Sequence, residues 1–106
     1  MIAKVGKDVG CVQPGDRVTA ALGHGGYAEE VVAPETNVVP IPEGMDFPTA
    51  ASFPVAYGTA HLALTHRASL KEGDVLLVHG AAGSVGRAAV EIGKCLGATG
   101  IATAAG

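Results

Sequence analysis

The residues best suited to chemistry lie between positions 79 and 86, where the sequence reads HGAAGSVG. Gly83 and Gly86 fit the second and third glycines of the pattern G-x-G-x-x-G, and Ala81 replaces the first. In such a turn the second glycine lets the backbone approach a pyrophosphate, and the third allows a helix to pack close to a strand. Amide groups at the start of the helix then face the negative charge. No Gly-Lys-Ser or Gly-Lys-Thr closes the turn, which excludes a P-loop.

The segments around this turn predict a strand, a helix and a second strand. The apolar run Val75–Val78 is typical of a parallel strand covered on both faces. From Ser84 the period becomes helical, with Gly97 at the position of a C-terminal cap and with apolar residues on one face: Val85, Ala88, Ala89, Ile92 and Leu96. A strand should follow from Ala98 through Ala102. This order favours a nucleotide-binding turn, and the alternative is a turn whose glycines are purely structural.

The second strand also bears on the choice of cofactor. In a dinucleotide-binding fold, an acidic residue at the end of this strand binds the ribose hydroxyls of NAD. No acid occurs between Ala98 and Gly106. Because a carboxylate would repel a 2′-phosphate, its absence favours NADP(H) over NAD.

The first half of the chain reads as short strands separated by turns. We expect strands over Arg17–Ala20, after the turn Pro14–Asp16, and over Tyr27–Ala33, after Gly25 and Gly26. The prolines and glycine that follow interrupt any long element, and they mark a crossing between structural units: Pro34, Pro40, Pro42 and Gly44.

Two short helices should connect the halves. Asp46 is a suitable N-cap for a helix that begins near Phe47, and Pro54 should end or kink that helix. A second helix is expected over Tyr57–Arg67, with Ala60 and Leu64 on one face, followed by a turn at Lys71–Asp74.

Composition limits the classes of protein to consider. The 106 residues are 48% hydrophobic, which excludes a disordered chain and predicts one globular domain or pieces of two. The net charge of −3 arises from scattered residues without a basic stripe, so nucleic acid is not an expected partner. No segment has the length or apolar character to cross a membrane. Cys11 and Cys95 form no close pair, which fits a reducing, cytoplasmic location.

Several spaced motifs, taken in order, resemble the medium-chain dehydrogenase/reductase superfamily. The most similar branch is that of the zinc-free quinone oxidoreductases related to zeta-crystallin. The resemblance covers nearly the whole chain, and these segments carry it: Gly15-Asp16-Arg17-Val18, Gly25-Gly26-Tyr27-Ala28-Glu29, Ala50-Ala51-Ser52 with Pro54, Tyr57-Gly58-Thr59-Ala60, and Val78-His79-Gly80-Ala81-Ala82-Gly83-Ser84-Val85-Gly86.

The resemblance implies an α/β chain that is a fragment of such an enzyme. The latter part of a GroES-like β-barrel would occupy residues 1–45, connecting helices residues 46–73, and the first strand-helix-strand unit of a Rossmann fold residues 74–106. Hydride transfer from NADPH to a quinone or an α,β-unsaturated ketone would be the reaction of the intact enzyme, which we expect to be a homodimer. The protein would position cofactor and substrate and would supply no covalent nucleophile.

The resemblance also assigns cofactor-binding residues. Ala82, Gly83, Ser84 and Val85 match the phosphate-facing turn, with Gly86 completing the glycine pattern. Ala105 and Gly106 match the end of the second strand, near the adenosine ribose. Thr59 matches a threonine near the nicotinamide, although it could equally bond back to a helix carbonyl. No residue is assigned a catalytic role.

A metal site is not expected. Zinc alcohol dehydrogenases of the superfamily carry four closely spaced cysteines between the segments that match GDRV and GGYAE, where this chain has only Thr19–His24. His24 has no cysteine nearby and reads as a loop residue. His61 and His66 read as surface or packing residues on a helix. His79 could approach the cofactor, but a structural hydrogen bond is the favoured role, and Cys95 is expected in the core.

Two alternatives remain open. The intact protein could be another zinc-free member of the superfamily, such as an enoyl reductase. It could also be a truncated, non-catalytic product that binds nucleotide weakly or binds only a protein partner. Half a barrel and the start of a parallel sheet would expose strand edges and apolar faces, so we expect low stability or self-association of the isolated chain.

Overall fold

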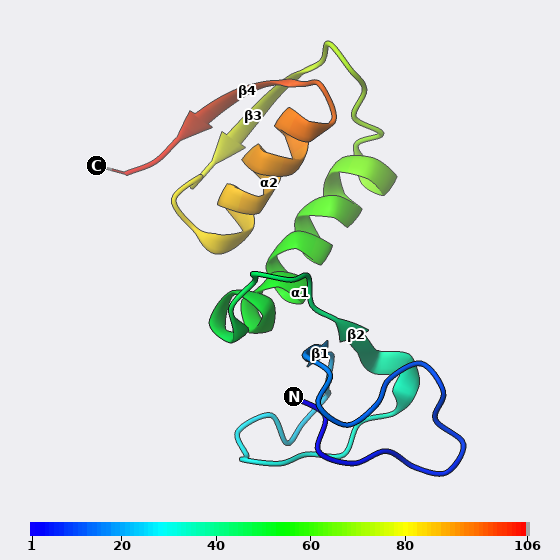
Figure 1. Ribbon diagram of the computed structural model, residues 1–106. Helices are drawn as coiled ribbons and strands as arrows, with labels where there is room; N and C mark the ends of the chain where they lie inside the picture. Colours follow the sequence, from blue (N-terminus) through cyan, green and yellow to red (C-terminus); the bar gives the residue numbers. More distant parts are fainter. Residues whose placement is uncertain (106) are drawn as a thin grey trace. The chain divides into compact units, whose positions relative to one another are not determined.

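The computed structural model describes residues 1–105 and divides the chain into two compact units, Met1–Ser52 and a second unit that begins at Phe53. The elements follow in this order (Figure 1): β1 (Val18–Ala20), a 3₁₀ helix (Glu35–Asn37), β2 (Val38–Pro40), α1 (Phe47–His61), a π-helical turn (Leu62–Arg67), β3 (Val75–His79), α2 (Ser84–Cys95) and β4 (Thr99–Thr103). No helix formed by residues 1–105 has both the length and the apolar character needed to span a bilayer.

In the first unit, β1 pairs antiparallel with β2, and Thr19 lies opposite Val39. The prediction of a strand over Tyr27–Ala33 is wrong, because this segment has no regular structure and Tyr27 is fully exposed. An alternating sequence becomes a strand only when a partner strand and a covering surface are present. Within the described residues β1 pairs instead with β2, a strand that the prolines concealed in the sequence.

The start of α1 is fixed by two polar residues. The Asp46 carboxylate accepts a hydrogen bond of 2.8 Å from the Thr49 amide, which confirms the predicted N-cap. The Thr49 hydroxyl and amide, together with the Arg17 charge, lower the pKa of Asp46. Arg17 donates a hydrogen bond of 2.6 Å to the Met45 carbonyl, and its guanidinium lies 4.7 Å from the centre of the Phe47 ring.

A second carboxylate organises the loop before β1. Oε1 of Glu35 accepts hydrogen bonds from the amides of Gly10 at 2.9 Å and of Cys11 at 2.6 Å. The two amides lower the pKa of Glu35, and the carboxylate in turn raises the pKa of the Cys11 thiol. Glu35 therefore joins segments that lie 25 residues apart.

The sequence predicts that Pro54 ends or kinks the first helix. The predicted end is wrong, because α1 continues through Pro54 to His61. The fixed φ of proline is compatible with a helix, and the missing amide removes a single hydrogen bond. Burial of Ala56, Ala60 and Leu64 beyond the proline favours continuation of the helix. The two predicted helices therefore form one run that ends in the π-helical turn.

The second unit contains the predicted strand-helix-strand arrangement. β3 and β4 pair in parallel, with Val75 opposite Thr99 and His79 opposite Thr103. At the end of α2, Gly97 has a φ of 81°, and the amide groups of Gly97 and Ala98 bond to the carbonyls of Lys94 and Gly93. This left-handed glycine cap confirms the predicted end of the helix.

Helix α2 packs against the β3–β4 sheet and against α1 (Figure 1). Ala88 is completely buried and forms the core with Ala56 and Ala60 of α1, next to Ala89 and Ile92. Toward the sheet, Gly93 lies against the Leu76 side chain, and a Cβ atom added at Gly93 would require the end of that side chain to shift. The apolar face predicted for this helix therefore meets α1 as well as lying over the sheet.

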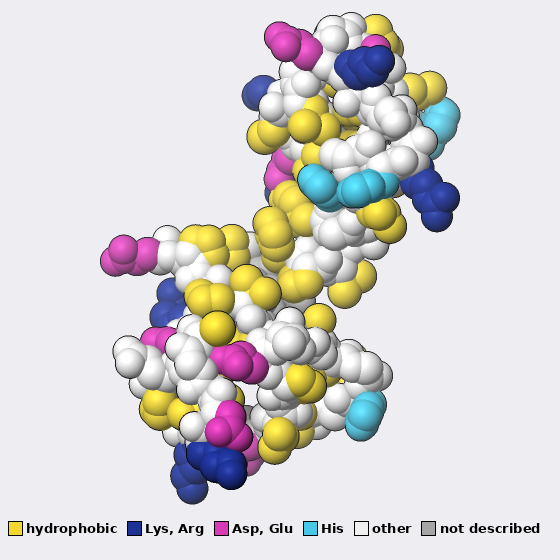
Figure 2. Space-filling model, turned by 90° about the vertical axis from the view of Figure 1, so that its right-hand side faces the viewer, with side chains coloured by type: hydrophobic (Ala, Val, Ile, Leu, Met, Phe, Trp, Pro, Cys, Tyr) yellow, Lys and Arg dark blue, Asp and Glu magenta, His cyan; other side chains and the backbone are white. Residues whose placement is uncertain are grey.

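The prediction that β3 is covered on both faces is wrong for residues 1–105. Leu76 and Val78 are shielded, whereas Val75 is 66% exposed and Leu77 is 53% exposed. Because side chains alternate along a strand, α2 covers one face of the sheet and leaves the other open. Ile101 of β4 is also half-exposed, and Figure 2 shows that many apolar side chains reach the surface. Basic side chains on the face shown in Figure 2 lie in separate places and form no stripe.

Candidate cofactor-binding site

The glycine-rich turn joins the end of β3 to the start of α2. Gly80 has a φ of 67°, a left-handed value that favours glycine, and the Gly83 amide bonds back to its carbonyl at 3.0 Å. The Ala81 amide donates to the Thr103 carbonyl at 2.9 Å. The turn therefore lies beside the carboxyl ends of both parallel strands, where ligands of open α/β sheets bind.

The two glycines of the motif have different surroundings. A Cβ atom added to Gly86 would collide with the Gly80 carbonyl oxygen and would lie 2.8 Å from the Ala81 Cα atom. A Cβ atom added to Gly83 would lie 3.4 Å from the same oxygen, which is close but tolerable. Gly86 thus permits the close approach of helix and turn that the sequence pattern predicts.

The start of α2 has amide groups available for an anion. Gly83 is the N-cap residue and has no side chain to bond them, and no acidic residue occurs in the first turn. The Arg87 amide makes the first bond back to the Gly83 carbonyl, at 2.8 Å. The preceding amides, of Ser84, Val85 and Gly86, lack a partner at the i−4 position within the helix. With the helix dipole they make this end of α2 suited to a negatively charged group.

The structure groups most of the residues predicted to bind cofactor. Ala82 and Gly83 lie in the turn, and Ser84, Val85 and Gly86 form the first turn of α2. Ala105 lies two residues beyond β4 and is exposed, on the side of the sheet where Thr103 meets Ala81. Gly106 lies outside the described residues.

Thr59 lies apart from this group, on the exposed surface of α1. Among residues 1–105 its hydroxyl makes no hydrogen bond, whereas Thr65 of the π-helical turn donates to the His61 carbonyl at 2.6 Å. The bond from Thr59 to a helix carbonyl, the alternative role of this residue, is therefore not made within residues 1–105.

The histidines and cysteines have structural or exposed positions. Nδ1 of His79 lies 3.1 Å from the Thr103 hydroxyl, which confirms the expected structural hydrogen bond. His24, His61 and His66 are exposed, and residues 1–105 contain no group of three metal-binding side chains. Cys95 is exposed, and the prediction of a core position is wrong. It lies two helical turns beyond the buried Ala88 on the same face of α2, but the elements that cover Ala88 leave this last turn exposed.

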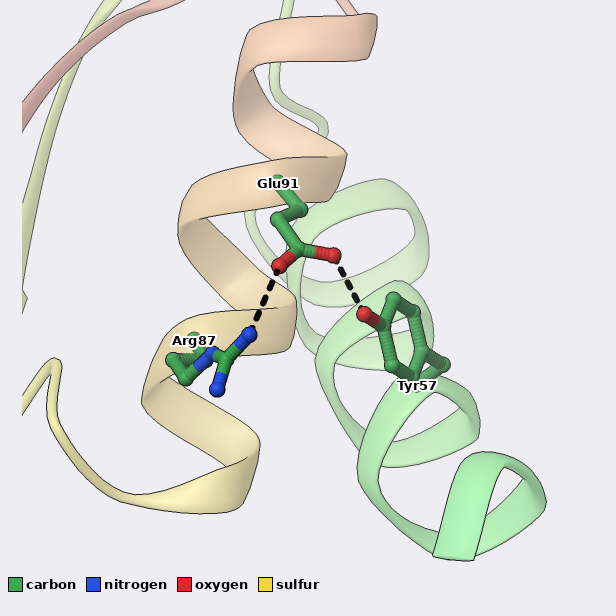
Figure 3. Close-up of polar contacts among 3 residues, drawn as sticks. All are labelled: Tyr57, Arg87 and Glu91. Atoms are coloured by element: carbon green, nitrogen blue, oxygen red, sulfur yellow. Dashed lines mark hydrogen bonds and ion pairs between the residues drawn. The ribbon is translucent and has the colours of Figure 1, made fainter. Parts of the chain in front are cut away.

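Sequence reasoning missed a polar cluster at the contact between α1 and α2 (Figure 3). The Tyr57 hydroxyl donates to the Glu91 carboxylate, whose other oxygen lies 3.8 Å from the Arg87 guanidinium. The bond to Glu91 is the main cause that raises the pKa of Tyr57. The sequence holds a signal for the pairing of Arg87 with Glu91, because the two residues are four positions apart in a predicted helix. It holds none for the contact of Glu91 with Tyr57, because these two residues are 34 positions apart.

Comparison with known proteins gives a consistent set of relatives, although no family model matches the chain. The quinone oxidoreductase of Sus scrofa is 41% identical over 105 residues, which cover 98% of this chain and 32% of the relative. The solved quinone oxidoreductase of Thermus thermophilus, also described in complex with NADPH, is 40% identical with a TM-score of 0.82, covering 87% of this chain and 31% of that one.

A second type of enzyme is equally similar. The solved CurK enoyl reductase has 39% identity and a TM-score of 0.90, covering 97% of this chain and 31% of that one. The chain thus spans about a third of the length of each of these three enzymes. It is therefore a homologue of the quinone oxidoreductases and enoyl reductases of the medium-chain dehydrogenase/reductase superfamily.

Proposed function

We propose that this chain forms part of an NADPH-dependent, zinc-independent reductase that transfers a hydride to a quinone or an α,β-unsaturated carbonyl compound. The observation that carries the proposal is the turn between β3 and α2, where Gly86 has no space for a side chain and the first amides of α2 lack a side-chain cap. The quinone oxidoreductase homologues support the same reaction class.

In this proposal each predicted residue acts through its position. Amide groups of Ala82, Gly83, Ser84 and Val85 would bind the pyrophosphate, and Gly86 would keep α2 close to the turn. Ala105 and Gly106 would lie near the adenosine ribose, and Thr59 near the nicotinamide. The cofactor would supply the hydride, and the residues of the chain would orient it.

The preference for NADPH has two supports. No acidic residue that would repel a 2′-phosphate occurs between Ala98 and Gly106. The homologous enzyme of Thermus thermophilus is described in complex with NADPH. Zinc independence is supported by the short link Thr19–His24, which has no cysteine.

The wider organisation belongs to the same proposal. Residues 1–45 would contribute to a GroES-like domain, residues 46–73 would connect the domains, and residues 74–106 would begin the Rossmann domain. The intact enzyme would be a cytoplasmic homodimer. The parallel β3–β4 pair and the connecting α2 support the Rossmann assignment.

A titration of the purified chain with NADPH, and separately with NADH, tests this proposal. Nicotinamide fluorescence and protein melting are followed together. Saturable binding that prefers NADPH, with a rise in melting temperature, is the expected result. A folded chain that binds neither nucleotide contradicts the proposal and favours a non-catalytic product.

An enoyl reductase is the second candidate function, and the similarity to the CurK enoyl reductase favours it. Both reactions deliver a hydride to a conjugated acceptor, so the cofactor site does not separate them. NADPH oxidation by the enzyme is compared with 1,4-naphthoquinone and with a crotonyl thioester as acceptors. A higher kcat/KM for the thioester would replace the quinone assignment with this one.

A non-catalytic protein-binding role is the third candidate. The open face of the β3–β4 sheet, with Val75, Leu77 and Ile101, is the observation that favours it. Absence of nucleotide binding together with self-association would support this role.

A further inference from the structure

The buried centre of the contact between α1 and α2 is built from small side chains. Ala56 and Ala60 of α1 meet Ala88 of α2, and all three are buried. Helices normally lock together when large side chains form ridges that fit into grooves. The three alanines form few such ridges, and the larger apolar side chains that pack against them, Tyr57 and Ile92, are only partly buried. Apolar packing therefore defines the rotation and the axial position of α1 on α2 less firmly than interlocking large side chains would.

One hydrogen bond adds a specific contact between α1 and α2, where the apolar contact is made chiefly by small side chains. Within residues 1–105, the hydrogen bond from the Tyr57 hydroxyl to Oε2 of Glu91 is the one that joins the two helices. The Glu91 carboxylate is itself oriented, because Oε1 lies 3.8 Å from Arg87 (Figure 3). The Tyr57 ring is stacked on Phe53, with centroids 4.1 Å apart and planes 12° apart. Both partners of the hydrogen bond are thus held from a second side.

Tyr57 and Thr59 lie on opposite flanks of the alanine contact. Residues two positions apart in an α-helix are separated by about 200° around the axis, so the contact made by Ala56 and Ala60 lies between them. A rotation of α1 that broke the bond to Glu91 would therefore move Thr59 as well. The other end of the bond belongs to α2, whose first turn holds the phosphate-facing amides.

We propose that Tyr57 is a positioning residue for the cofactor site: its hydrogen bond to Glu91 fixes α1 on α2 and thereby places Thr59 at a set distance from the glycine-rich turn. This inference rests on the proposed function, in which NADPH reaches from the turn to Thr59. The pyrophosphate and adenosine half of the cofactor needs the glycine-rich turn, the start of α2 and the end of β4, and it makes no use of α1. The nicotinamide half contacts Thr59 and therefore needs the correct position of α1 relative to α2. Only this half of the cofactor depends on Tyr57.

The test compares two ligands by isothermal titration calorimetry on the purified protein: NADPH and 2′-phospho-ADP-ribose, which lacks only the nicotinamide. Tyr57→Phe keeps the ring stacked on Phe53 and removes the hydroxyl. We expect this variant to bind NADPH about tenfold more weakly, the loss of one hydrogen bond to a charged group, and to bind 2′-phospho-ADP-ribose within a factor of two of wild type. Tyr27→Phe, at the fully exposed second tyrosine, is the matched control and should change neither affinity.

Two further variants separate positioning from general destabilisation. Glu91→Gln still accepts a hydrogen bond from Tyr57 and should restore most of the NADPH affinity that Glu91→Ala loses. In a Thr59→Val background, Tyr57→Phe should cause no additional loss, because the residue to be positioned has been removed.

Several outcomes overturn the inference. Equal weakening of both ligands by Tyr57→Phe would show a general structural role, and unchanged NADPH affinity would show no role. Full additivity of Tyr57→Phe and Thr59→Val would show that the two residues act independently. If the wild-type protein binds neither ligand, the proposed function itself fails and this inference fails with it.

Discussion

Gly86 lies directly against the backbone of the Gly80 turn, so close that a Cβ atom at position 86 would come within 2.8 Å of the Ala81 Cα atom. The first turn of α2 can therefore approach the end of β3 only because residue 86 has no side chain. This contact sets the place of the amides that the proposed cofactor site uses.

Substitution Gly86→Ala should therefore destabilise the protein and abolish nucleotide binding. The methyl group would meet backbone atoms, which cannot rotate away, so we expect a loss of about 1–3 kcal/mol in the free energy of unfolding. Denaturant unfolding and NADPH titration measure the two effects. Gly100→Ala in β4 is the control, because a Cβ atom there has no neighbour within 4 Å. Equal stability of the two variants would show that the close approach does not exist in solution.

A carboxylate at position 105 should reverse the cofactor preference. Ala105 lies exposed beyond β4, and Ala105→Asp would place a negative charge where the proposal puts the 2′-phosphate. We expect NADPH to bind about tenfold more weakly while NADH binding is kept or improved. Thr99→Asp, at the exposed start of the same strand, adds the same charge at the opposite end and should leave the ratio unchanged. An unchanged ratio in Ala105→Asp contradicts the assignment of this residue to the ribose site.

The open face of the sheet should cause self-association. Val75, Leu77 and Ile101 are each at least half-exposed on adjacent parallel strands. Leu77→Lys should shift the purified chain toward monomer in sedimentation velocity at micromolar concentration. Val32→Lys, at an exposed loop position, is the control. A wild-type monomer with a sharp, cooperative thermal transition would refute this expectation.

Stability of the first unit should fall in acid. The pKa of Glu35 is lowered from its ordinary value of 4.5 and that of Asp46 from 3.8, in both cases chiefly by hydrogen bonds that the ionised carboxylate accepts. Groups with a depressed pKa in the folded state stabilise the fold above their ordinary values, and this stabilisation is lost as the pH falls through the folded-state pKa. The melting temperature of wild type should therefore decline below about pH 4.5, the ordinary value for Glu35.

The variant Glu35→Gln identifies the group responsible. It should melt lower than wild type at pH 7, and the difference should shrink as the pH falls through the depressed pKa of Glu35 and the wild-type carboxylate becomes protonated. Glu29→Gln, at an exposed glutamate in the irregular segment after β1, serves as the comparison and should follow the wild-type profile. A constant difference between Glu35→Gln and wild type across the pH range would exclude the linkage.

The sequence by itself determined the parallel strand-helix-strand unit around the glycine-rich turn. Its signals are local: the apolar run of β3, the helical period from Ser84, and Gly97, whose φ of 81° few other residues adopt readily. The N-cap of α1 was readable for the same reason, because Asp46 bonds an amide only three residues away. The order of the motifs also gave the resemblance to the superfamily whose quinone oxidoreductases and enoyl reductases are homologues of this chain.

Only the tertiary structure decided which surfaces are covered and which distant residues meet. Strand formation depends on a partner elsewhere in the chain, so Tyr27–Ala33 stayed irregular while Val38–Pro40 paired with β1. The apolar run of β3 indicates a strand that is suited to burial. Covering both faces of this strand requires a neighbouring element on each side of the sheet, and residues 1–105 supply only α2. The bond between Tyr57 and Glu91 likewise exists because α1 and α2 pack together, a contact between helices that no local pattern in either helix specifies.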